Sequence, residues 1–89
     1  MIVFEEKFKK GDYIINRKCG DMAVYDKTDK NGYMHFKHYY GKMFDSFHDV
    51  KKYTMQINYQ KFYELCNDDE KNRMDDLIEN GTREKEHIW

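Results

Sequence analysis

Residues 22–40 read MAVYDKTDKNGYMHFKHYY, and this stretch decides the fold class. Two strand-like runs, 22–25 and 33–40, flank the Asn31-Gly32 dipeptide, which favours the primed turn of a β-hairpin. Because side chains alternate along a strand, the second run predicts two faces. The expected core face carries Met34, Phe36, His38 and Tyr40, and the opposite face carries Tyr33, His35, Lys37 and Tyr39.

Further strands are expected on both sides of this hairpin. Residues 13–17 are aromatic and β-branched, and a turn at Gly20 joins them to the run 22–25. Residues 51–58 alternate between apolar and polar side chains and predict a fourth strand, whereas residues 42–49 are expected to form a loop. The sequence thus predicts a small antiparallel sheet or half-barrel of about four strands.

A helix is predicted over residues 68–80. Asn67 is a favourable N-cap, acidic residues fill the first turn, and Glu70 stands where a capping box places its acid. Gly81 supplies the stop after the last turn. The preceding residues, 59–66, fit a strand and a helix equally well, and both interpretations stay open.

The length and composition fit one α+β domain. The chain has 89 residues, of which 37% are charged, and its mean hydropathy is −1.11. Eight Tyr, six Phe and one Trp offset the shortage of aliphatic residues, because each ring can bury a large area. We expect a β-rich domain with its closing helix over 1–81 and a charged tail over 82–89.

Charge and end composition exclude several classes of protein. The 16 Lys and Arg against 17 Asp and Glu argue against a protein that coats nucleic acid. No apolar run is long enough for a membrane span, and the N-terminal one is too short for a secretory signal, so a cytoplasmic protein is expected. The two cysteines have no CxxC spacing, which predicts reduced thiols, no metal site and no cofactor.

The aromatic rings supply the candidate binding site. Tyrosine beside cationic groups is suited to gripping a peptide or stacking on a base. The predicted binding residues cluster in one segment: Tyr33, His35, Lys37, His38, Tyr39, Tyr40 and Phe44. The competing interpretation is that these rings form the core of a protein poor in aliphatic side chains, and the sequence alone does not decide between the two.

Catalysis is the least favoured hypothesis. His38 and His48 are the candidate bases, but neither has an identifiable orienting partner. Ser46 lacks the flanking glycines of a nucleophile elbow, and the five glycines are scattered rather than gathered in a phosphate-binding loop. No catalytic residue is assigned.

Two stretches resemble known proteins. Residues 8–15, FKKGDYII, are similar to the Gly-Asp entry into the first strand of many SH3-like barrels, which implies an SH3-like half-barrel. Residues 65–71, LCNDDEK, with the preceding hairpin and aromatic strand, resemble small uncharacterised proteins of gut bacteria and their phages. In those proteins the helix starts Leu-Ala-Thr-acid-acid-Glu-Lys, and here Cys66 and Asn67 replace Ala and Thr. This second resemblance implies a phage or bacterial accessory protein of anti-defence type.

The leading hypothesis is a non-enzymatic interaction module that binds a protein partner through its aromatic and basic surface. The alternative is a small-molecule protein that holds a nucleotide-like ligand. Because 89 residues leave little interior volume, that alternative requires a homo-oligomer whose interfaces enclose the ligand.

Overall fold

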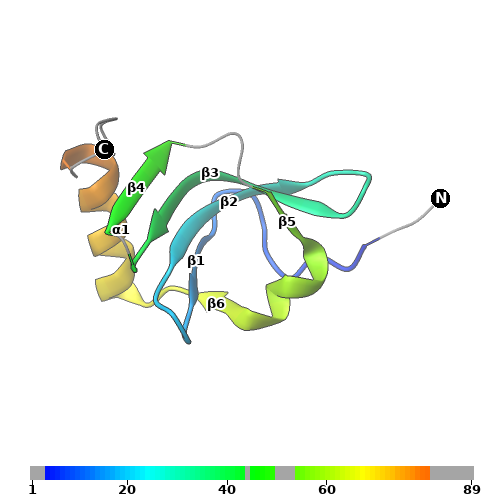
Figure 1. Ribbon diagram of the computed structural model, residues 1–89, viewed down its shortest axis with the longest axis horizontal. Helices are drawn as coiled ribbons and strands as arrows, with labels where there is room; N and C mark the ends of the chain where they lie inside the picture. Colours follow the sequence, from blue (N-terminus) through cyan, green and yellow to red (C-terminus); the bar gives the residue numbers. More distant parts are fainter. Residues whose placement is uncertain (1–3, 44, 50–53, 81–89) are drawn as a thin grey trace.

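The computed structural model describes residues 4–43, 45–49 and 54–80 (Figure 1). Within those ranges, six strands form one antiparallel sheet, followed by a single α-helix. The elements are β1 (Tyr13–Asn16), β2 (Met22–Thr28), β3 (Tyr33–Gly41), β4 (Ser46–Asp49), β5 (Thr54–Gln56), the 3₁₀ helix η1 (Ile57–Phe62), β6 (Tyr63–Leu65) and α1 (Asp68–Asn80). The α+β class, with a small antiparallel sheet and a C-terminal helix, is confirmed.

The strand order is β4-β3-β2-β1-β6, and β5 pairs with β3 beside β4. The two halves of β3 therefore have different neighbours on one side: β5 pairs with its first residues and β4 with its last. The sheet is open, and Figure 1 shows α1 at one end of it and the tip of the β2–β3 hairpin at the other. In the described part of the chain, no helix has the length and apolar character needed to cross a membrane.

The expected loop over 42–49 is wrong in its second half, which forms β4. The turn before this strand closes when the Asp45 amide donates to the Lys42 carbonyl at 3.1 Å. Asp45 has a φ of 50°, a left-handed conformation that Asp adopts more readily than most residues, so the turn forms without a glycine. Phe47 in β4 then lies in the core.

The segment from 51 to 66 divides into several elements. The expected strand over 51–58 is shorter, because β5 ends at Gln56 and η1 begins at Ile57. Residues 51–53 lie outside the described ranges. Both interpretations of residues 59–66 hold in part, since η1 ends at Phe62 and β6 follows at once.

Two β-bulges interrupt the pairing of β2 with β3. Val24 pairs with His38 and Tyr25 pairs with Phe36, which leaves Lys37 as an extra residue in β3. The next pair, Lys27 with His35, leaves Asp26 as an extra residue in β2. A single inserted residue reverses the side-chain alternation beyond it.

The reversal corrects the faces predicted for β3. Met34 and Phe36 lie in one core cluster, whereas Tyr40 lies in the other. Tyr39, expected on the opposite face, packs against the cluster that contains Phe36. The prediction that Met34, Phe36, His38 and Tyr40 share one face is therefore wrong, because the Lys37 bulge separates the strand into two halves of opposite phase.

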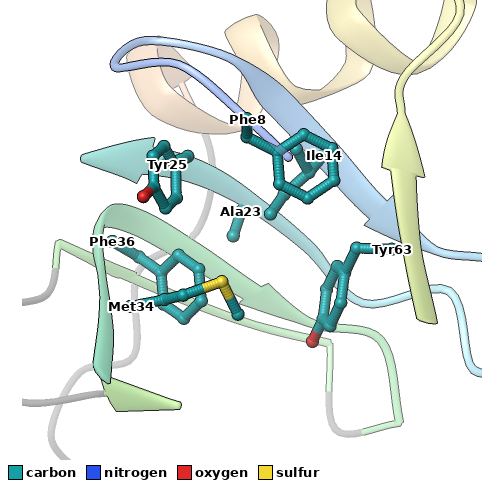
Figure 2. Packing of buried hydrophobic residues seen from close by; sticks show 7 residues of the cluster. All are labelled: Phe8, Ile14, Ala23, Tyr25, Met34, Phe36 and Tyr63. Carbon is teal, nitrogen blue, oxygen red and sulfur yellow. The ribbon is translucent and has the colours of Figure 1, made fainter. Parts of the chain in front are cut away.

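Each face of the sheet therefore carries one buried cluster. Figure 2 shows the first cluster, which gathers side chains from the N-terminal segment, β1, β2, β3 and β6: Phe8, Ile14, Ala23, Tyr25, Met34, Phe36 and Tyr63. The second cluster lies under α1 and contains Ile15, Met22, Val24, Tyr40, Phe47, Cys66 and Met74. Two clusters accommodate more rings than the single core that the sequence pattern suggested.

Helix α1 begins and packs as predicted. The Asn67 side chain accepts from the Glu70 amide at 2.9 Å, and the Glu70 carboxylate accepts from the Asn67 amide at 2.8 Å, which completes the capping box. Met74 is fully buried, with Leu77 and Ile78 packed beside it on the same cluster. The tail predicted over 82–89 lies outside the described residues.

Candidate functional site

The six predicted binding residues that the structure describes do not share one exposed surface. Tyr33 is 38% exposed and Lys37 is exposed, whereas Tyr40 is only 2% exposed. His35, His38 and Tyr39 are half-buried, and Phe44 lies outside the described residues. The Lys37 bulge is one reason, because it puts Tyr33 and His35, which precede it, on the face of the sheet opposite to that of Tyr39, which follows it.

The Tyr40 ring is buried in the core, and its hydroxyl contacts two polar side chains. Its hydroxyl donates to Asp45 Oδ1 at 2.6 Å and accepts from the Arg73 guanidinium at 3.2 Å. The same guanidinium lies 5.5 Å from the centre of the Tyr40 ring. Burial raises the pKa of Tyr40, and the hydrogen bond to Asp45 adds to that effect. This ring joins β3 to α1 and is not available to a partner.

Tyr39 and His35 are each engaged by a carboxylate. The Tyr39 hydroxyl donates to Asp21 Oδ2 at 2.9 Å, and burial raises the pKa of Tyr39. His35 Nε2 lies 2.8 Å from Asp29 Oδ2, and this contact lowers the pKa of Asp29 more than any other. The other Asp29 oxygen accepts hydrogen bonds from the Asn31 and Tyr33 amides. Through Asp29, His35 is therefore linked to the turn of the β2–β3 hairpin.

Lys37 and His38 do share a concavity. Where the bulge re-aims the strand, a hollow of about 310 Å³ opens between the sheet and α1. We name it the Lys37 hollow; its lining residues are Lys10, Gly11, Tyr13, Val24, Tyr25, Lys37, His38 and Ile78. His38 stacks on Phe47 with ring centroids 5.6 Å apart and an interplanar angle of 21°, which orients the imidazole.

Local backbone bonds fix the floor and the rim of the Lys37 hollow. The Gly11 amide donates to the Tyr25 carbonyl at 2.8 Å, and the Tyr25 amide donates to the Asp12 carbonyl at the same distance. These bonds hold the turn that carries Lys10 against β2, one residue before its bulge. Gly11 has a φ of 91°, which favours glycine at this position.

Two lysines, Lys10 and Lys37, line the Lys37 hollow beside His38. Lys10 Nζ lies 3.5 Å from Asp26 Oδ1. The Lys10 side chain is 79% exposed, so this ion pair is weak and leaves the ammonium able to turn toward a ligand. On the helix side, Tyr13 donates its hydroxyl to Asp75, which raises the pKa of Tyr13 to about 12.

A larger groove lies on the other side of Gly11 and Tyr13. It has a volume of about 670 Å³, and its charged lining residues are Asp12, Asp68, Lys71 and Asp75. Two of these carboxylates already accept hydrogen bonds, Asp12 from the Lys9 amide and Asp75 from Tyr13. The charged lining of this groove is mainly acidic, whereas two lysines, Lys10 and Lys37, line the Lys37 hollow.

Sequence reasoning missed several residues of the hollow and several exposed rings. Lys10 and Ile78 come from segments 68 residues apart, and no local pattern links them to β3. Tyr59 and Phe62 on η1 are 46% and 41% exposed, with ring centroids 6.0 Å apart. The open choice between strand and helix for residues 59–66 concealed these rings, since a helix places residues three apart on one side whereas a strand separates them.

The part of the chain that the structure describes contains no group of three or more His, Cys, Asp or Glu that could hold a metal ion. Comparison of the chain with models of known families, with curated proteins and with solved structures gives no match. Function must therefore be inferred from the geometry of the Lys37 hollow.

Proposed function

We propose that this chain is a non-enzymatic interaction module that binds a protein partner through the Lys37 hollow. One observation carries the proposal: a β-bulge places Lys37 and His38 together with Lys10 over an apolar floor, in a formed concavity. Bulges recur beside binding sites because they re-aim side chains that regular pairing would keep apart.

A protein partner fits this site better than the nucleotide-like ligand. The volume of about 310 Å³ stands at the lower limit of small-molecule pockets and accommodates one side chain more readily than a base with its sugar and phosphate. Among the described residues, the exposed rings include Tyr59 and Phe62 on η1, and aromatic side chains of this kind are enriched in protein interfaces. The resemblance to proteins of gut bacteria and their phages would make the partner a host or defence protein.

Affinity capture with matched variants tests the proposal. The chain is immobilised and incubated with extract of its native host, in parallel with Lys37→Glu and with Lys30→Glu. Lys30 is exposed in the turn of the β2–β3 hairpin and serves as the control for a change of net charge. We expect a protein that the wild type and Lys30→Glu retain and that Lys37→Glu loses.

Circular dichroism checks that all three proteins are folded. Retention of the same proteins by Lys37→Glu would reject the Lys37 hollow as the binding surface. Capture of nothing by the wild type at micromolar concentration would reject the interaction module itself.

A further inference from the structure

The structure points to a carboxylate as the group that the Lys37 hollow recognises, and we propose that this carboxylate is carried on a short apolar body belonging to the partner. The inference rests on the proposed function and names the chemistry of the same site. Neither a nucleotide nor an uncharged apolar side chain is then the expected ligand of the hollow.

The charges around the hollow define where the carboxylate would lie. Lys37 and His38 come from adjacent positions of β3, and Lys10 comes from the turn that is bonded to β2; all three line the hollow. The ammonium groups of lysines donate charge-assisted hydrogen bonds to carboxylate oxygens. Asp26 beside Lys10 reduces the local excess of positive charge, which suits a ligand with one negative charge better than a phosphate dianion.

The helix side of the hollow defines where the apolar body would lie. Ile78 of α1 and the ring of Tyr13 line this side, and Val24 forms part of the floor. Asp75 holds the Tyr13 hydroxyl, so its negative charge disfavours an anion at that end. A ligand therefore places its carboxylate toward Lys37 and its hydrocarbon toward Ile78.

Two kinds of protein group have this chemistry: a C-terminal carboxylate on an apolar residue and an acidic side chain within a chain. Four probes separate them from each other and from a nucleotide. N-acetyl-leucine carries a terminal carboxylate, N-acetyl-glutamate α-amide carries a side-chain carboxylate, N-acetyl-leucinamide has no charge, and adenosine monophosphate represents the nucleotide.

The experiment is a titration of the ¹⁵N-labelled chain with each probe, followed by amide chemical shifts. We expect one or both carboxylate probes to shift Gly11, Val24, Lys37 and His38 saturably, and N-acetyl-leucinamide to leave them unmoved. Lys37→Gln should weaken the binding of the carboxylate probe about tenfold, as expected for one charge-assisted hydrogen bond, and Lys30→Gln should not change it. The stronger of the two carboxylate probes identifies the source of the group.

Equal shifts from N-acetyl-leucine and its amide would overturn the carboxylate, and tighter saturable binding of adenosine monophosphate would replace it with a phosphate ligand. Absence of saturable shifts from every probe would also reject the inference. Partner capture that depends on Lys37 would still stand in that case, so failure here is distinguishable from failure of the proposed function.

Discussion

Tyr39 and Tyr40 are consecutive in β3 and enter different cores of the same sheet. Tyr40 packs in the cluster under α1, whereas Tyr39 packs against the other cluster, with its ring centroid 5.9 Å from that of Phe36. Consecutive residues of a strand normally point to opposite faces, but here both faces are buried. The second face is buried because α1 covers it at this end of the sheet.

Replacement of Tyr40 by Ala should destabilise the fold rather than only weaken binding. The ring is 2% exposed, and removal of a large buried aromatic side chain costs about 3 kcal/mol of the free energy of unfolding. The matched control is Tyr33→Ala, which removes a ring that is 38% exposed and should cost less than about 1 kcal/mol. Urea unfolding followed by circular dichroism measures both, and equal losses would contradict the assignment of Tyr40 to the core.

Replacement of Tyr39 by Phe should reveal a coupling to Asp21. The Tyr39 hydroxyl donates to one Asp21 oxygen at 2.9 Å, and the Lys42 amide donates to the other at 2.8 Å. Loss of a hydrogen bond to a charged group costs about 1.5 kcal/mol. A double-mutant cycle with Tyr39→Phe and Asp21→Ala should therefore give a coupling energy of about 1 kcal/mol. Additive effects of the two substitutions would mean that the hydrogen bond contributes nothing to stability.

The local signals in the sequence were sufficient for the elements that local interactions determine. The helix over 68–80 and the reciprocal bonds of Asn67 with Glu70 involve residues close in the chain. The hairpin at Asn31-Gly32 also forms where predicted, but its turn is not primed, because Gly32 has a φ of 85° and Asn31 does not have a positive φ. The Gly32 amide instead donates to the Asp29 carbonyl at 3.0 Å, which closes an ordinary turn followed by a glycine bulge. The β-bulges were not predictable, because an extra residue in one strand depends on the register of its partner. Lys37 is identified as the insertion because Val24 pairs with His38 and Tyr25 pairs with Phe36, and that register is a property of the folded sheet.

The same limit applies to the candidate site. Lys37 and His38 were predicted as binding residues because tyrosines lie close to them in the sequence. The structure places them with Lys10 and Ile78 instead. The sequence could identify side chains with suitable chemistry. It could not show that a turn before β1, a bulge in β3 and the last turn of α1 come together around one hollow.

Stability should fall in acid because two carboxylates have lowered pKa values in the folded chain. The contact with His35 lowers the pKa of Asp29, and the hydrogen bond from Arg17 lowers the pKa of Glu70. Each group binds its proton more readily when unfolded, so its contribution to stability is complete above the ordinary pKa, near pH 4, and is lost as pH falls through the folded value. Urea midpoints should therefore decrease between pH 5 and pH 2.5.

Asp29→Asn and Glu70→Gln are the matched variants for this pH dependence. Each should be less stable than the wild type at pH 7, and the difference should shrink as pH falls, since the wild-type carboxylate loses its charge when it takes up a proton. The double variant should have the flattest profile of the three variants. An unchanged slope in both single variants would assign the acid sensitivity to other groups.

The capping box at the start of α1 should have a measurable effect on stability. Asn67→Ala removes the side chain that accepts from the Glu70 amide and should lower the free energy of unfolding by about 1 kcal/mol. Asn72→Ala is the control, because Asn72 is exposed within the helix and Ala is the better helix former. A loss at Asn72 as large as that at Asn67 would argue against a specific capping effect.

The two thiols should react at very different rates. Cys19 is exposed in the turn between β1 and β2, whereas Cys66 lies in the cluster under α1. Burial raises the pKa of Cys66 to about 11, so both access and the thiolate fraction disfavour its reaction at pH 8. An aromatic disulfide reagent should therefore modify one thiol rapidly in the native chain and both thiols in urea.

Cys19→Ser should abolish the rapid phase, and the remaining slow phase should accelerate in Tyr40→Ala, because loss of that ring destabilises the cluster that shields Cys66. A rapid phase that persists in Cys19→Ser would mean that Cys66 is accessible, and the packing of α1 on this face of the sheet would then be wrong.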